Sequence, residues 1–236
     1  MKGNSSVKHK PVVTIDGPAG GGKSTISRQL AERLDFIYLD TGALYRAVAF
    51  SLTQRGFSGD EKELADFCRD LKVELKNIAG HLHVFIDAED VTGKIRTEEI
   101  GVLASTVSAA PVVREALLSI QRDVAADGGV VAEGRDMGTV VFPEAEIKFF
   151  LDASVKERAN RRYRELIGRG QLTDLRDVEC DLILRDRQDR ERAVAPLRVP
   201  RDAVLVDSTE KTIPQVIDIM MGVIEKYWPH PQPRKK

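Results

Sequence analysis

A glycine-rich motif near the start of the chain is the feature that most constrains the fold. Residues 17–25 read GPAGGGKST and match G-x-x-x-x-G-K-[ST]. The β-branched run PVVTID precedes the motif, and apolar residues at helical spacing, Ile26, Leu30 and Leu34, follow it. The chain then enters a second apolar run, FIYLD. Strand, loop, helix and strand in this order predict a βαβ unit of a parallel sheet.

The residue types of this motif predict phosphate binding. Glycines let successive backbone N–H groups point at an anion, and the helix that follows adds its positive N-terminal end. Lys23 is expected to neutralise the β- and γ-phosphates of a nucleoside triphosphate, and Ser24 to ligate Mg²⁺. The residues expected to hold the triphosphate are Gly17, Pro18, Ala19, Gly20, Gly21, Gly22, Lys23, Ser24 and Thr25.

The rest of the chain continues the α/β pattern with one interruption. GGVVAEGRD, IKFFLDAS and AVLVDS are apolar runs that end in polar groups, as expected where parallel strands open onto a ligand crevice. Residues 72–97 instead contain the strand-like stretches VELK, HLHVFID and EDVTGKI, which predict a small antiparallel insertion. One helix is expected after Asp40 or Thr41 as N-cap, and another after Pro111. The predicted fold class is α/β, a parallel sheet with helices on both faces.

Composition argues against several other classes of protein. Among 236 residues, 36 basic and 37 acidic side chains leave a net charge of -1, which gives no general attraction to nucleic acid or anionic membranes. No stretch approaches the ~18 consecutive apolar residues of a membrane span. Cys68 and Cys180 lack metal-ligand spacing, which favours buried, reduced thiols in a cytoplasmic protein. We expect flexible tails at residues 1–10 and 229–236.

A second set of residues is suited to a second anionic substrate. The chain has no N-K-x-D motif, which a GTPase switch would need to recognise guanine, whereas a small-molecule kinase needs an acceptor site beside the donor site. Helical spacing puts Thr41 and Tyr45 on one face, with Arg46 beside them. Arg135 and Asp136 follow a buried strand and are expected near the path of the transferred phosphoryl group.

An arginine-dense segment between the last two strands supplies a candidate lid, at residues 156–192. Arg185, Asp189 and Arg192 fall at i, i+4 and i+7 and are predicted to share one helical face, whereas Arg187 and Arg190 point elsewhere and suit the triphosphate. Arginines on a closing lid stabilise the charge that spreads over the transferred phosphoryl oxygens. Closure also excludes water, which would otherwise accept that group.

Several longer blocks resemble one family. GPAGGGKST with DTGALYR, EDVTGKIRTEEI, EGRDMGTVVFPEA, IKFFLDAS and RDRQDRERAVAPL occur in the order and spacing seen in bacterial cytidylate kinases. The resemblance spans roughly Val12 to Ile224, and the blocks GRDMGTVVFP and DRxxAVAPL are more specific than the phosphate-binding loop. It implies phosphoryl transfer from ATP, with Mg²⁺, to CMP or dCMP in pyrimidine nucleotide metabolism. It also implies a single kinase domain at 11–228, with a monophosphate-binding part at about 41–110.

The resemblance also assigns roles to individual residues. It implies contacts to the cytosine ring and its surroundings by Thr41, Ser105, Arg114, Asp136 and Arg192. It implies contacts to the sugar by Arg185 and Asp189, and to the acceptor phosphate by Tyr45, Arg46 and Arg135. The predicted catalytic residues are Lys23, Arg135, Arg185 and Arg190. Some members have Asp where this chain has Glu133, which leaves open how the water shell of the metal is held.

Two alternatives remain open at this point. Within the enzymes, the alternative is a kinase for another monophosphate such as UMP, or for a small alcohol. Outside them, it is a nucleotide-dependent binding switch that turns over no second substrate. The four histidines lie outside every motif, so no catalytic role is expected for them. We expect a monomer, and the sequence does not decide between ribose and deoxyribose.

Overall fold

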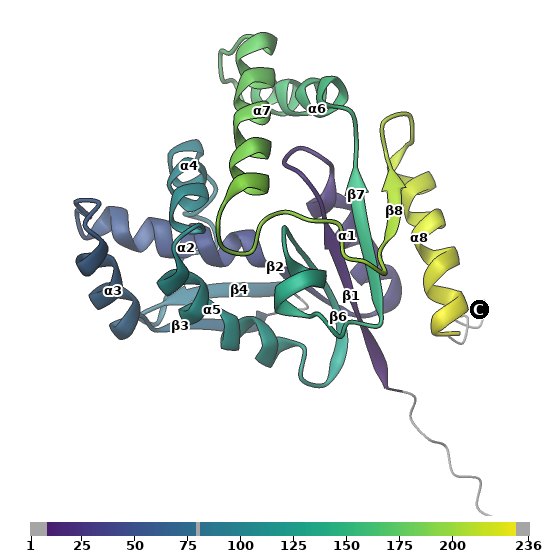
Figure 1. Ribbon diagram of the computed structural model, residues 1–236, viewed down its shortest axis with the longest axis horizontal. Coiled ribbons are helices and arrows are strands. Elements are labelled where there is room, and N and C mark those ends of the chain that lie inside the picture. The colour runs from purple at the N-terminus through teal and green to yellow at the C-terminus, as the bar shows by residue number, and fades with distance from the viewer. Residues whose placement is uncertain (1–8, 79–80, 230–236) are drawn as a thin grey trace, which may run out of the picture.

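The computed structural model describes residues 9–78 and 81–229, and its centre is a five-stranded sheet (Figure 1). All strand pairs in this sheet are parallel, in the order β2-β6-β1-β7-β8. The strands are β1 (Lys10–Asp16), β2 (Ile37–Asp40), β6 (Gly128–Gly134), β7 (Ile147–Asp152) and β8 (Val204–Asp207). The predicted parallel sheet is therefore confirmed. Of the tails expected at residues 1–10 and 229–236, residues 1–8 and 230–236 lie outside the described residues, and Lys10 already belongs to β1.

Alternating side chains of β6 supply two hydrophobic layers, as expected for a strand covered on both faces. Val131 packs in the layer that contains α1 (Lys23–Leu34) and α8 (Ile213–Tyr227). Its neighbours Val130 and Ala132 point to the opposite layer. All three side chains are 0% exposed, so β6 is covered on both faces.

The second layer joins the sheet to the antiparallel insertion. It contains residues of α5 (Pro111–Val124), which was expected, and of the single-turn π-helix η1 (Met137–Val141). The other expected helix, α2 (Thr41–Gln54), packs with α5 and the insertion in a separate hydrophobic cluster. The insertion is a three-stranded antiparallel sheet, which confirms its predicted type. Its strands are β3 (Val73–Ile78), β4 (His81–Ile86) and β5 (Glu89–Asp90). The third is shorter than EDVTGKI suggested, because the chain turns away after Asp90.

Two helices on either side of the antiparallel insertion in the sequence were not predicted. They are α3 (Glu61–Asp70) and α4 (Glu98–Val107). Both begin with a side-chain cap: Asp60 accepts from the backbone N–H of Glu63, and Thr97 accepts from that of Ile100. Each also carries two glutamates in its first turn, which favour a helix start through the helix dipole.

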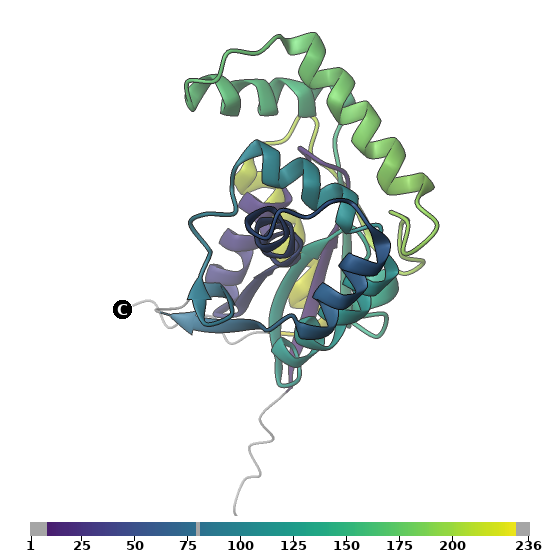
Figure 2. The same cartoon turned by 90° about the vertical axis from the view of Figure 1, so that its left-hand side faces the viewer.

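The arginine-dense segment forms a helix pair that arches over the carboxyl ends of the strands (Figures 1 and 2). It consists of α6 (Val155–Gly168) and α7 (Leu175–Glu191). The prediction that Arg192 shares a helical face with Arg185 and Asp189 is wrong. Arg192 does not lie on the helical face of α7, because its backbone, at φ -58° and ψ 139°, has already left the helix.

Two further observations bear on the sequence-based expectations. Among the described residues, no single helix is long and apolar enough to cross a membrane; α4 and α5 together pass by length and composition but are bent by 101°. Both cysteines are free thiols, but only Cys68 is buried, so the expectation of a buried thiol is wrong for Cys180. Cys180 lies on α7, whose outer side has no neighbouring layer to cover it (Figure 2).

Candidate active site

A large cavity lies at the carboxyl edge of the parallel sheet. Its volume is about 870 Å³, and it is lined by the loop after β1, the start of α2, the end of β6 and both lid helices. Along the strand order, the chain moves from β1 to β2 in one direction and later from β6 to β7 in the opposite direction. Ligands of open α/β sheets bind at such a reversal, outside the carboxyl ends of the strands.

The glycine loop is built so that no side chain fills the space above it. Gly17 has φ 153°, and a Cβ there would lie 2.0 Å from the carbonyl oxygen of Leu151 on β7. Gly22 is the N-cap of α1 with φ 89° and supplies no side-chain cap. The first N–H groups of α1 are therefore left for a ligand at the cavity, which is how helix N-termini bind phosphate.

Lys23 lies in this loop with its charge poorly solvated. The side chain is 6% exposed, and Nζ donates to the carbonyl oxygen of Pro18 at 2.7 Å. Burial, and next to it repulsion from Arg135, together lower the pKa of Lys23 to about 7, against the opposing attraction of Glu133. A bound phosphate would favour the ammonium form, so Lys23 is placed to gain a proton when an anion arrives.

Beside Lys23, hydrogen bonds join the loop to the ends of β2 and β6. The hydroxyl of Tyr38 donates to the Glu133 carboxylate, and the Ser24 hydroxyl is hydrogen-bonded to both of these residues. Thr41 Oγ1 donates to the backbone carbonyl of Glu133 at 2.7 Å. Burial raises the pKa of Glu133, and the negative charge of Asp40 raises it further. This corner thus concentrates oxygen ligands and negative charge next to the phosphate loop.

The opposite wall of the cavity contains a buried carboxylate between two arginines. Asp136 is 2% exposed; its Oδ2 accepts from Arg114, and its Oδ1 lies 3.6 Å from Arg192. Burial raises the pKa of Asp136, although both arginines oppose that shift. The Arg114 guanidinium also lies 5.6 Å from the centre of the Tyr45 ring. A planar ring entering this wall would meet donors and an acceptor in fixed positions.

A second ion pair links the end of β6 to the lid. Arg135 Nε donates to Asp189 Oδ2 at 2.6 Å. Burial alone would raise the pKa of Asp189, but the hydrogen bond and attraction to Arg135, together with the charges of Arg192 and Lys23, outweigh burial and lower it. The backbone N–H of Leu197 donates to the carbonyl oxygen of Asp189 at 2.7 Å, so the loop after α7 is also fixed at this residue. Arg135 is therefore held where strand, lid and cavity meet.

The structure brings most of the predicted site residues into this one cavity. All ten residues expected to bind the monophosphate line it: Thr41, Tyr45, Arg46, Ser105, Arg114, Arg135, Asp136, Arg185, Asp189 and Arg192. So do residues 19–25 of the glycine loop, whereas Gly17 and Pro18 are buried beneath it. Arg190 is exposed on α7 and does not line the cavity. The individual roles remain predictions.

Sequence reasoning missed several residues that shape the cavity. Arg161 lines it from α6 and donates through Nη2 to the backbone carbonyl of Ser208 at 2.6 Å. Arg158 is 2% exposed and joins the carbonyl oxygen of Ala19 to Asp186 on α7. The sequence does contain a signal for these residues. Arginines recur three and four residues apart after Ser154, which is a good N-cap, so they are expected to share one helical face.

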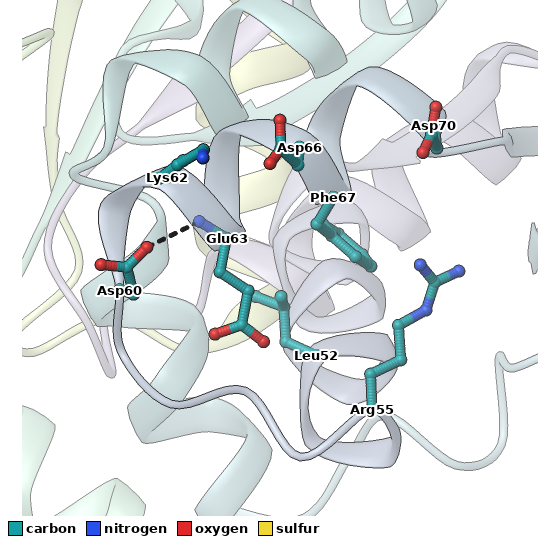
Figure 3. Close-up of a pocket in the computed structure, with 8 residues that line it drawn as sticks. All are labelled: Leu52, Arg55, Asp60, Lys62, Glu63, Asp66, Phe67 and Asp70. Atoms are coloured by element: carbon teal, nitrogen blue, oxygen red, sulfur yellow. Dashed lines mark hydrogen bonds between the residues drawn. The ribbon is translucent and has the colours of Figure 1, made fainter.

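A second cavity lies against α3, away from the glycine loop. Its volume is about 480 Å³, and acidic side chains surround Phe67 and Arg55 (Figure 3). Its carboxylates already have local partners: Asp60 caps α3, and Glu63 accepts from the Ser58 hydroxyl at 2.6 Å. Its lining includes neither the glycine loop nor the arginines of the first cavity. The cavity under the lid is therefore the candidate active site.

Comparisons with known proteins agree with this geometry. The model of the cytidylate kinase family matches residues 13–226. The cytidylate kinase of Citrifermentans bemidjiense is 50% identical over 216 residues, which cover 91% of this chain and 93% of the relative. That of Chromobacterium violaceum is 48% identical and covers 92% of this chain and 96% of its own length. The family match spans the sheet, the insertion and the lid, and one cavity contains both a phosphate loop and an arginine-flanked carboxylate. This chain therefore belongs to the cytidylate kinase family.

Proposed function

We propose that this protein transfers the γ-phosphoryl group of ATP to the 5′-phosphate of CMP or dCMP, giving ADP and CDP or dCDP. The observation that carries the proposal is a single cavity with two unlike ends. One end is a glycine loop that presents backbone N–H groups and Lys23. The other is a wall of arginines around buried Asp136. Two phosphorylated substrates fit such a cavity when their phosphates meet between the two ends.

The residues of the site act by positioning and by charge. The acceptor phosphate is already ionised at neutral pH, so transfer needs no strong general base. Lys23 would hold the β- and γ-phosphates, and Arg135 and Arg185 would neutralise the oxygens of the transferred group. Arg190 would join them when the lid closes over ATP. Holding both reacting atoms in line supplies most of the rate enhancement, and exclusion of water prevents hydrolysis of ATP.

Mg²⁺ fits the corner formed by Ser24, Tyr38 and Glu133. This ion prefers oxygen ligands and keeps several of its waters, and the corner offers the Ser24 hydroxyl and the Glu133 carboxylate beside the phosphate loop. When bound, it would offset the negative charge of the triphosphate. Ser24 would be its direct ligand, and Glu133 would orient its water shell, a role in which the longer side chain replaces the aspartate of some relatives.

Asp136 is the residue we propose to recognise cytosine. Cytosine presents an exocyclic amino group next to two acceptors, whereas uracil presents a carbonyl oxygen in place of that amino group. A carboxylate accepts from the amino group, and Arg114 and Arg192 donate to the neighbouring acceptors. Thr41 and Ser105 would complete the contacts to the ring and its surroundings. Uracil would leave Asp136 facing another acceptor, which a buried site penalises strongly.

The remaining assignments divide the chain by task. We propose residues 41–110 as the monophosphate-binding part, where Tyr45 and Arg46 contact the acceptor phosphate. Residues 156–192 would be the lid, and its Arg185 and Asp189 would contact the sugar. One chain supplies every group in this scheme, which supports a monomer as the active species. A cytoplasmic location follows from the need for both nucleotides.

An acceptor panel tests the proposal. Purified protein is assayed with ATP and Mg²⁺ against CMP, dCMP, UMP, AMP and dTMP, with the diphosphate product measured directly. We expect CMP and dCMP to be preferred by ~10²-fold, the factor that corresponds to one unsatisfied buried polar group. Equal rates on AMP or dTMP would overturn the cytidylate assignment. Slow hydrolysis of ATP without a phosphorylated product would instead support a binding switch.

A further inference from the structure

Among the acidic side chains that line the phosphate cavity, Glu98 has no part in the scheme above. It belongs to the first turn of α4, in a region rich in arginines. Its carboxylate accepts from Nη2 of Arg162 on α6, so this ion pair joins the monophosphate side to the lid. Nη1 of Arg162 also donates to Glu165 within α6, at 2.9 Å. Phosphates are the anions expected in this position, and a protein carboxylate there competes with them.

The surroundings of Glu98 strengthen this reading. A Cβ added to Gly101, one turn further along α4, would lie 3.6 Å from Nη2 of Arg185, so α4 runs directly beside that guanidinium. Glu98 also attracts Arg185 electrostatically, while Arg135, Arg162 and Arg46 repel it. Without a nucleotide, these like charges destabilise one another, and a nearby carboxylate reduces that cost.

We propose that Glu98 is a positioning residue that takes the place of a nucleotide phosphate in the free protein. It holds Arg162, and with it the lid helix α6, across the cavity until the triphosphate of ATP displaces the carboxylate and takes over the arginine. The proposal rests on the assignment of this cavity to ATP. It predicts that Glu98 weakens ATP binding while leaving the bound, reacting complex unchanged.

The chain contains a closely matched control for this idea. Glu99 follows Glu98 in the first turn of α4, is also exposed, and is absent from the lining of the cavity. Glu98→Gln and Glu99→Gln therefore remove the same charge from the same helix turn and alter the helix dipole equally. Any difference between the two variants reports on the position of Glu98 in the cavity, because net charge and helix stability change alike.

Isothermal titration calorimetry with ATP tests the proposal. We expect Glu98→Gln to lower the Kd for ATP about twofold to fivefold, the factor that a partly exposed ion pair is worth, and Glu99→Gln to leave it within about 1.5-fold. The difference should shrink at high salt, where exposed charges are screened. In steady-state assays the KM for ATP should fall while kcat stays within about twofold.

Two results would overturn this role for Glu98. One is a Glu98→Gln variant whose Kd for ATP equals that of Glu99→Gln, and the other is a variant that binds ATP more weakly. The unmodified protein keeps this failure separate from a failure of the proposed function. If it binds ATP normally, only the role of Glu98 is lost; if it does not bind ATP at all, the assignment of the cavity is wrong.

Discussion

The two ends of the active-site cavity are built in opposite ways. The donor end is one contiguous stretch, residues 17–25, whose main contribution is backbone N–H groups held by glycine conformations. The acceptor end is assembled from side chains on α2, α4, α5 and α7 and in the loops that follow β6 and α7. A backbone site depends mainly on the local fold, whereas this side-chain site depends on several distant elements, the lid among them, being in place.

This contrast predicts that mutations at the two ends of the cavity differ in their effects on turnover, substrate choice and stability. Loss of a donor-end charge should abolish turnover and leave the fold intact. Loss of an acceptor-end charge should alter both substrate choice and stability, because those charges are paired inside the protein. Substitutions at Lys23, Asp136 and Tyr38 and the uptake of protons on ATP binding test this contrast.

Lys23→Ala should give the largest loss of activity. The substitution removes the charge that neutralises the β- and γ-phosphates, and we expect kcat to fall about 10³-fold, as for other preorganised electrostatic groups. The free energy of unfolding should not decrease, because the buried ammonium has a pKa lowered to about 7 and gains little from burial. Steady-state kinetics and thermal melts check both points. Normal turnover in the purified variant would refute the loop assignment.

Asp136→Asn should change the choice of acceptor. An amide offers a donor as well as an acceptor, so discrimination between CMP and UMP should fall, and kcat/KM for CMP should drop about 10²-fold. Arg114 and Arg192 would lose a buried partner, and we expect a loss of about 3 kcal/mol in the free energy of unfolding. The acceptor panel and denaturant unfolding measure these effects. A variant that keeps its full preference for CMP would contradict the assigned role of Asp136.

Tyr38→Phe should raise the requirement for Mg²⁺. The hydroxyl of Tyr38 holds the Glu133 carboxylate beside Ser24, and without it we expect the Mg²⁺ concentration for half-maximal activity to rise about threefold to tenfold, the worth of one hydrogen bond. Binding of Mn²⁺ to the ATP complex, followed by electron paramagnetic resonance, should weaken in parallel. Tyr227→Phe is the control, since Tyr227 is 69% exposed. Equal behaviour of the two variants would remove Tyr38 from the metal corner.

The smallest expected effect is an uptake of protons when ATP binds. The pKa of Lys23 is lowered to about 7 in the free protein, so at pH 8 the side chain is mostly neutral, and the phosphates should restore the ammonium form. Binding at pH 8 should therefore take up close to one proton more than in Lys23→Ala, and the difference should vanish near pH 6. Calorimetry in buffers of different ionisation enthalpy measures it. A proton release specific to Lys23 would reverse the expected sign.

The same contrast explains what the sequence could predict. The donor end is contiguous, so its motif, its strand and its helix could all be predicted from local pattern. Part of the acceptor end, including Tyr45, Arg46 and Arg135, could also be predicted from helix spacing and strand ends. Ser105 and Arg114 could be identified only through longer family-specific blocks. The helix spacing that groups Arg185 with Asp189 fails at Arg192, where the helix has ended. Asp136 and Arg192 meet through the fold of the following loop and not through a shared helical face.

Elements whose structure depends on distant partners could not be predicted. The π-helix η1 starts where Asp16 of β1 accepts from the backbone N–H groups of Met137 and Gly138, both at 2.8 Å, across more than 100 residues of chain. Likewise, the pairing of Glu98 with Arg162 depends on the lid folding back over α4. No local pattern encodes either contact. By contrast, α3 and α4 carried ordinary capping signals that could have been recognised.

A crystal structure with CMP and a non-hydrolysable ATP analogue would show whether two phosphate sites face each other in this cavity. We expect the γ-phosphate to contact Lys23 and the glycine loop, and the CMP phosphate to contact Arg46 and Arg135. The two phosphates should face each other under the closed lid. Arginines turned outward into bulk solvent, with both nucleotides bound, would contradict it.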